Sequence, residues 1–169
     1  MPVAVGFRVD PKRVTYAVVS GPAADGKFTI VRVGEVRVPY ALYAPRQLRF
    51  IRTTLLDIIE ETGSTRAGLR TIESLAKRKH PFRLNLEGVV QELLASSDVE
   101  RFIAGPIATI ASQLGEDDRT VVKDYIDGTR PQLVKAGWDD LDELQREAVL
   151  VALCAGLGNP NHGITGGAR

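Results

Sequence analysis

The stretch VAVGFRVDPKRVTYAVV, residues 3–19, holds two short apolar runs separated by a polar turn, and it decides the class of fold. Each run is too brief for a helix and is rich in β-branched residues, which is typical of strands. The segment Asp10-Pro11-Lys12-Arg13 between the runs has the composition of a turn. Residues 3–19 therefore predict two strands joined by a short turn at the start of the chain.

Working outward, the sequence adds one more strand and then alternates helices with strands. The expected elements are strands at 28–38, 68–73 and 99–104, and helices at 46–62, 84–96, 107–114 and 117–126. Asp139 or Asp140 is expected to cap a last, long helix that ends at Leu157. The predicted order is β-β-β-α-β-α-β-α, with an extra helical segment before the last helix, which indicates an α/β fold.

Composition predicts one globular domain. The chain has 169 residues, 44% of them hydrophobic and 25% charged, with a formal net charge of +1. This charge argues against a protein that binds polyanions by bulk charge alone. The single cysteine, Cys154, excludes a disulfide framework, and no signal peptide or membrane span is expected, so a cytoplasmic protein is predicted. We expect a domain at 1–157 and a flexible Gly-rich tail at 158–169.

Three clusters, read together with this order, resemble the ribonuclease H-like fold and, within it, the RuvC-type Holliday-junction nucleases. They are the residue 3–19 stretch, LRTIE at 69–73, and DDLDELQREAVLVAL at 139–153. The resemblance covers residues 3–157. It implies a five-stranded mixed sheet with helices on both faces.

The family resemblance also implies two-metal hydrolysis of phosphodiester bonds, in which carboxylates hold two Mg²⁺ or Mn²⁺ ions. The strand-end and helix positions of the family fall on Asp10, Glu73 and Glu147, which become the candidate catalytic residues and metal ligands. Glu143 shares a helix face with Glu147 and is a further candidate ligand.

The first catalytic position has two alternative alignments. Aligning on Asp10 matches an Asp-Pro pair common in RuvC but shortens the turn by one residue. Aligning on Gly6 needs no gap and places Arg8 where the metal-binding Asp should be. Residues 8 and 10 point to the same face of a strand, so either side chain could lie at the site centre. An arginine there would oppose metal binding by like charge and could substitute for a cation.

A basic stretch begins within the predicted strand at 68–73 and continues beyond it. Arg70, Lys77, Arg78, Lys79 and Arg83 are candidate nucleic-acid contacts, and a solvated loop is the alternative. The leading prediction is a RuvC-like nuclease of structured DNA or RNA. The alternatives are an inactive member that binds nucleic acid, with Arg8 at the site, and an assembly subunit of a larger complex. A homodimer is common among RuvC relatives and is therefore a further expectation.

Overall fold

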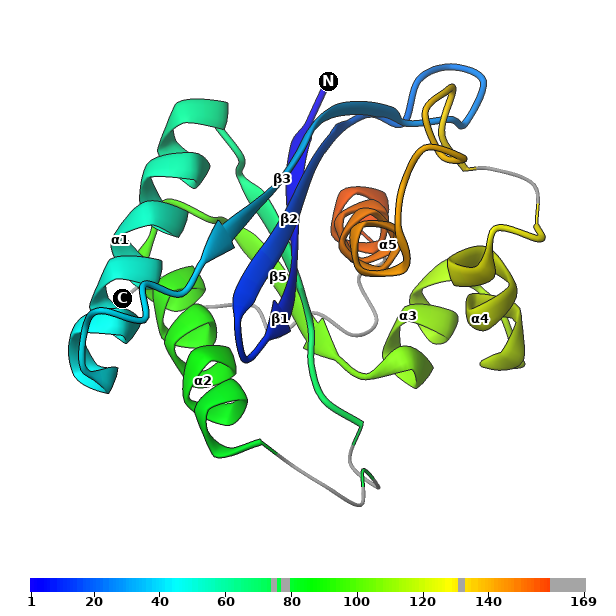
Figure 1. Cartoon of the computed structure of the whole chain (residues 1–169). Coiled ribbons are helices and arrows are strands. Elements are labelled where there is room, and N and C mark those ends of the chain that lie inside the picture. Colours follow the sequence, from blue (N-terminus) through cyan, green and yellow to red (C-terminus); the bar gives the residue numbers. More distant parts are fainter. Residues whose placement is uncertain (74–75, 77–79, 131–132, 159–169) are drawn as a thin grey trace.

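A five-stranded mixed sheet forms the centre of the computed structural model, which describes residues 1–73, 76, 80–130 and 133–158 (Figure 1). The strands are β1 (Val3–Asp10), β2 (Arg13–Ser20), β3 (Thr29–Arg37), β4 (Arg66–Arg70) and β5 (Arg101–Gly105). They lie in the order β3-β2-β1-β4-β5. The pairs β1–β2 and β2–β3 are antiparallel, whereas β1–β4 and β4–β5 are parallel. This topology confirms the predicted ribonuclease H-like α/β fold.

Helices cover both faces of the sheet (Figure 1). The helices α1 (Ala44–Thr62) and α2 (Pro81–Ser96) pack on one face, and α5 (Glu143–Leu157) lies on the other with α3 (Ile107–Leu114) and α4 (Thr120–Asp127) beyond it. Each face has its own hydrophobic core. Trp138 and Cys154 are both buried on the α5 side. No helix within the described residues is both long and apolar enough to span a bilayer.

The fourth strand is shorter than predicted, and this changes the site. Pairing between β4 and β5 ends at Arg70 opposite Gly105, and Pro106 follows Gly105 directly. The pairing of β4 with β1 ends at the same residue, Arg70 opposite Arg8, and beyond it the Thr71 amide donates to the Gly105 carbonyl at 2.9 Å. The residue at the end of the fourth strand is therefore Arg70, and Glu73 lies beyond it rather than within the strand as expected.

The ends of the helices also differ from the prediction. The N-cap of α5 is Asp142 rather than Asp139 or Asp140, because its carboxylate accepts the Gln145 amide at 2.8 Å while the Gln145 side chain returns a bond to the Asp142 backbone. Helices α1 and α2 begin earlier than their apolar patterns, each with a proline in its first positions, where the missing N–H costs nothing. Of the predicted tail at 158–169, only Gly158 lies within the described residues.

Two glycines let α5 approach the sheet closely. Gly6 of β1 and Gly68 of β4 are direct neighbours in the parallel ladder. A Cβ atom on Gly6 would collide with the Ala148 backbone, and one on Gly68 would collide with the Val151 backbone. The backbone of α5 therefore lies against β1 and β4, and side chains one turn toward its N-terminus reach the ends of the same two strands.

Candidate functional site: an arginine–glutamate network at the ends of β1 and β4

Strand alternation aims two arginines at α5. Because side chains alternate across a strand, Arg8 lies on the same face of β1 as Gly6, and Arg70 lies on the same face of β4 as Gly68. The parallel register places Arg8 directly opposite Arg70. The two guanidinium groups therefore meet at the carboxyl ends of adjacent strands, beneath the first turns of α5.

Glu147 of α5 joins these two arginines. Its Oε2 atom accepts a hydrogen bond from Arg8 Nε at 2.8 Å and lies 3.0 Å from Arg70 Nε. The second contact is an ion pair without the alignment of a hydrogen bond, since Arg70 Nε has no hydrogen-bond partner. Only 12%, 5% and 10% of the Arg8, Arg70 and Glu147 side chains are exposed. The three side chains form a buried Arg–Glu–Arg triad.

Glu73 extends the triad toward α3. Arg70 NH2 lies 2.7 Å from Glu73 Oε1, and the same oxygen accepts the backbone amide of Ile107 at 3.0 Å. Ile107 is the first residue of α3. Arg70 thus holds the segment after β4, and through Glu73 that segment is tied to the start of the helix after β5.

A fifth and a sixth charged residue complete the network from α2. Glu87 is buried, accepts Arg83 Nε at 3.0 Å, and accepts the Ile72 amide at 3.0 and 3.2 Å on its two oxygens. Each carboxylate in this network therefore faces a guanidinium. The arginines and glutamates are equal in number, so the network has no excess of negative charge.

The electrostatics favour arginine as the resident cation. Burial lowers the pKa of Arg8 from its ordinary value, as do the positive charges of Arg83 and Arg70, while Glu147 raises it. A guanidinium remains protonated in proteins even after such a shift, so Arg8 stays cationic at neutral pH. A permanent positive charge therefore lies at the end of β1.

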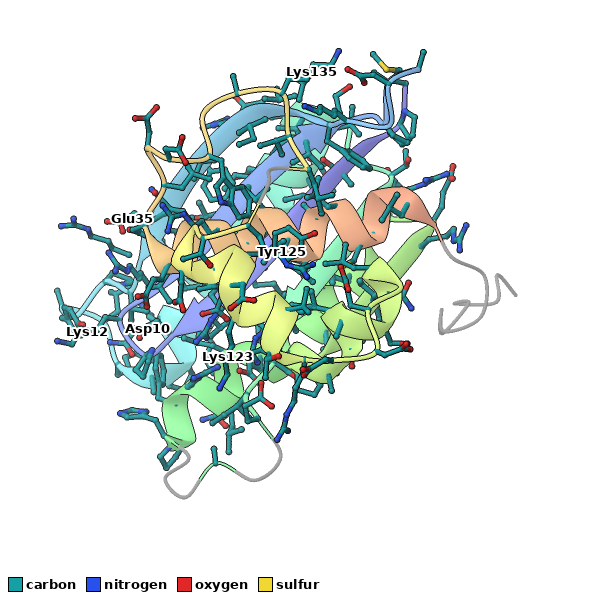
Figure 2. All side chains as sticks on the ribbon, turned by 90° about the vertical axis from the view of Figure 1, so that its right-hand side faces the viewer. Asp10, Lys12, Glu35, Lys123, Tyr125 and Lys135 are labelled. Carbon is teal, nitrogen blue, oxygen red and sulfur yellow. The ribbon has the colours of Figure 1, made fainter. Side chains whose placement is uncertain are left out.

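The structure does not bring the predicted metal ligands together. Glu147 lies at the centre, Glu73 lies on the far side of Arg70, and Asp10 lies past Arg8 as the last residue of β1. There Asp10 accepts the Lys12 amide at 3.0 Å, beside the Lys12 side chain (Figure 2). Glu143 is exposed on the first turn of α5. The metal-binding role of these four residues remains a prediction.

The donor set at the strand ends does not fit the two-metal centre that the fold implies. Mg²⁺ requires several oxygen ligands in octahedral geometry. The ends of β1 and β4 instead supply Arg8 and Arg70, and the oxygen of Glu147 that faces them already accepts a hydrogen bond from Arg8 and forms an ion pair with Arg70. A divalent cation would face two guanidinium groups at van der Waals range. Within the part of the chain that the structure describes, no group of three His, Cys, Asp or Glu side chains could hold a metal ion.

The predicted nucleic-acid contacts separate into two sets. Arg70 is buried in ion pairs, not exposed on a basic surface as expected, and Arg83 is partly buried against Glu87. Lys77, Arg78 and Lys79 lie outside the described residues. The contact of these three residues with phosphates therefore remains a prediction, whereas Arg70 belongs to the network of ion pairs.

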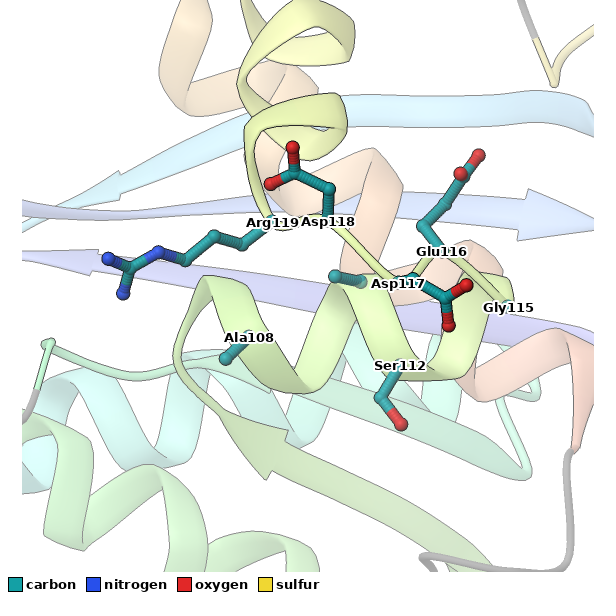
Figure 3. Close-up of a pocket in the computed structure, with 8 residues that line it drawn as sticks. Ala108, Ser112, Gly115, Glu116, Asp117, Asp118 and Arg119 are labelled. Carbon is teal, nitrogen blue, oxygen red and sulfur yellow. The ribbon is translucent and has the colours of Figure 1, made fainter.

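An acidic hollow between α3 and α4 is a separate feature. It is lined by Ser112, Glu116, Asp117 and Asp118 among others, and these side chains point in different directions (Figure 3). Arg130 pairs with Glu116 at 3.1 Å, and Asp118 accepts the Thr120 amide at 2.8 Å. Both carboxylates thus have local structural partners, and the hollow does not form a metal centre.

Three members of the network were not predicted as such. Arg70 and Arg83 were predicted as nucleic-acid contacts, and Glu87 lies among the apolar residues of α2. The available signals were the arginine at each end of RAGLR, residues 66–70, and a charged residue beside Leu86 on the apolar face of α2. Both patterns indicate charge directed into the interior, where a partner is required.

No protein-family model and no curated protein sequence matches the chain, but solved structures do. The Thermus thermophilus RuvC structure matches with a TM-score of 0.69 and 15% identity, over 92% of this chain and 94% of that one. The T. thermophilus RuvC in complex with a Holliday junction substrate matches with a TM-score of 0.66 and 13% identity, over 92% and 94%. The yeast mitochondrial Holliday junction resolvase matches with a TM-score of 0.53 and 12% identity, over 91% and 77%. The chain therefore has the ribonuclease H-like fold of the RuvC-type resolvases, with an arginine–glutamate network at the strand ends.

Proposed function

We propose that this protein is a non-catalytic ribonuclease H-fold module that binds branched or otherwise structured nucleic acid without cutting it. The observation that carries the proposal is the Arg8–Glu147–Arg70 triad. At the ends of the first and fourth strands, where a RuvC-type nuclease needs carboxylates, this chain has arginines. The triad supplies positive charge from the protein itself, so a metal ion is not needed to balance Glu147.

The nucleic-acid part of the proposal rests on the fold. One of the similar structures is RuvC bound to a Holliday junction, and it aligns with this chain over almost its whole length. A protein of this fold that lost the metal centre would keep the surfaces around it. The segment 77–79, which is basic in sequence, follows the network directly along the chain.

The network gives such a module a fixed binding surface. Ion pairs and backbone bonds to Glu73 and Glu87 tie the segment after β4 to α3 and α2. These contacts need neither substrate nor metal. Ile72 and Glu73 are therefore held in place before a ligand arrives, which reduces the ordering cost of binding.

The test compares binding with cleavage on one set of substrates. Purified protein is mixed with labelled four-way junction, duplex, single-stranded and RNA-containing substrates, in EDTA and then in Mg²⁺ or Mn²⁺. We expect binding that weakens steeply with salt, is the same with and without metal, and leaves every substrate intact. Replacing Lys77, Arg78 and Lys79 by alanine should weaken binding and reduce the salt slope.

Metal-dependent cleavage that Glu73→Gln abolishes would overturn the proposal and restore the nuclease with Asp10, Glu73 and Glu147 as its centre. Failure of the wild-type protein to bind any of these substrates at low salt would overturn the nucleic-acid half and leave the assembly subunit. The variant Arg119→Gln, which changes an exposed arginine remote from the strand ends, controls for loss of charge alone.

A further inference from the structure

A surface on the α1 side of the sheet combines exposed aromatic rings with positive charge. It is formed by the turn between β1 and β2, the segment from β3 into α1, and the first turns of α1. We define this aromatic-basic patch by six residues: Lys12, Tyr40, Tyr43, Arg46, Arg49 and Phe50. It lies on the opposite face of the sheet from α5 and Glu147, so it is not part of the network described above (Figure 1).

The patch follows the chain from Tyr40 to Phe50, with Lys12 joining it, and it is hollowed at two points. Lys12 and Tyr40 line one hollow, at the end of the β1–β2 turn. Arg46, Arg49 and Phe50 line the second, on one face of α1. Residues 40–42 run from the first hollow to the second, because Tyr40 belongs to one lining and Leu42 to the other.

The aromatic rings of the patch are not needed by the core. Tyr40, Tyr43 and Phe50 are 69%, 64% and 43% exposed. Helix α1 already fills the core with Ile51, Leu55, Ile58 and Ile59 on its other face. Three such rings within eleven residues form an exposed apolar group rather than the scattered single residues that a surface normally carries.

The charges of the patch do not serve the helix either. Arg46 and Arg49 lie in the first two turns of α1, where the helix dipole favours anions, and the first turn holds no acidic residue. No Asp or Glu occurs between residues 36 and 56. Among the described residues, no carboxylate forms an ion pair with Lys12, Arg46 or Arg49. Arg46 and Arg49 therefore present uncompensated positive charge at a positive helix end, whereas Lys12 shares its hollow with Asp10.

One contact arranges a ring and a charge together. The Arg46 guanidinium lies over the Tyr43 ring, 5.5 Å from its centroid, and Arg46 Nε donates to the Tyr43 hydroxyl at 3.2 Å. This stack leaves the other face of the ring available. A flat apolar partner can stack there while its negative charge meets Arg46 and Arg49.

We propose that the aromatic-basic patch binds unpaired nucleotides, with the bases stacked on Tyr40, Tyr43 and Phe50 and the phosphates against Lys12, Arg46 and Arg49. The inference rests on the proposed function and names the part of the nucleic acid that this surface takes. Unpaired bases fit because their faces are free to stack, whereas those of a duplex are covered by neighbouring pairs. The positive charge fits a phosphate backbone better than an apolar protein partner, which would not need it.

The experiment measures binding of two labelled ligands by fluorescence anisotropy in EDTA. One is a fork with two single-stranded arms, and the other is a fully paired four-way junction. The test variant is Tyr43→Ala with Phe50→Ala. Tyr43 makes no side-chain capping bond to α1, so its loss leaves the helix start intact. The matched aromatic variant is Tyr43→Phe with Phe50→Tyr, and the control is Val31→Ala, another exposed apolar side chain outside the patch.

We expect the alanine variant to bind the fork about tenfold or more weakly than the wild type, because each stacked base contributes to affinity. Its affinity for the paired junction should change less than twofold, and the aromatic variant and Val31→Ala should match the wild type on both ligands. Equal binding of the fork by wild type and alanine variant, with the wild type still binding the junction, would overturn this inference alone and leave a protein partner for the patch. Loss of all binding in the wild type would instead overturn the proposed function.

Discussion

Replacing Glu147 by glutamine tests whether the triad is a buried charge cluster. The substitution keeps the size of the side chain and a similar helix propensity, but removes the one negative charge between Arg8 and Arg70. Two guanidinium groups whose side chains are 12% and 5% exposed would then face each other without their shared partner.

The magnitude follows from the geometry. At about 4 Å and an effective dielectric constant of about 20, each attraction is on the order of 4 kcal/mol, and Glu147 makes two at 2.8 and 3.0 Å. Desolvation of the carboxylate offsets part of this, so the net loss expected is that of a broken buried pair, about 3–5 kcal/mol. For a domain of this size, the melting temperature should fall by about 6–20 °C.

Urea unfolding followed by circular dichroism measures the loss as a change in midpoint at constant slope. Glu143→Gln is the matched control, because Glu143 lies one turn earlier on the same helix and is exposed; its unfolding free energy should change by less than about 0.5 kcal/mol. A combined Arg8→Met, Arg70→Met and Glu147→Leu variant should be close to the wild type in stability, since apolar replacement of a whole buried ion cluster is often neutral or stabilising. A loss below about 1 kcal/mol in Glu147→Gln would refute the description of the triad as a desolvated cluster.

Three further predictions concern the metal centre, the thiol and the packing of α5. Arg8→Asp with Arg70→Glu should create a cation site beside Glu147. Mn²⁺ should therefore raise the melting temperature of this variant and leave that of the wild type unchanged. An unchanged melting temperature of the variant in Mn²⁺ would show that the strand ends are too far apart for a shared ion. Burial raises the pKa of Cys154 to about 12, so its thiol should react with a disulfide reagent at pH 8 only after urea unfolding, and its contribution to stability should be lost as pH rises from about 9 to about 12; rapid reaction of the folded protein would contradict this burial. Gly68→Ala should destabilise the fold by about 1–3 kcal/mol, because the added Cβ forces α5 away from β4. Gly88→Ala, where a Cβ meets open space on α2, should stabilise the fold by about 0.5–1 kcal/mol. Equal effects of the two substitutions in thermal unfolding would contradict the close packing of α5 on β4.

Local patterns were sufficient for the fold. Two apolar runs around Asp10-Pro11 predict the hairpin, and helical spacing predicts α1, α2 and α5. Each element repeats its apolar residues at the spacing of its own secondary structure. The ends of elements were less predictable. Thr71, Ile72 and Glu73 have the composition of a strand, and only the end of the pairing with β1 and β5 shows that β4 stops at Arg70.

The site depended on pairings that no local pattern contains. Glu147 was predicted as the helix carboxylate of the site, and Arg8 was named as the alternative to Asp10 at the first-strand position; the structure pairs Glu147 with Arg8. The partner Arg70 could not be placed, because its position opposite Arg8 is a register between strands almost sixty residues apart along the chain. The sequence by itself therefore determined the order of elements, which follows from side-chain periodicity, and its resemblance to the RuvC-type nucleases pointed to the helix carboxylate. Only the tertiary structure decided that the carboxylate meets two arginines, since β-sheet register and the close approach of α5 over Gly6 and Gly68 set which charges share one buried space.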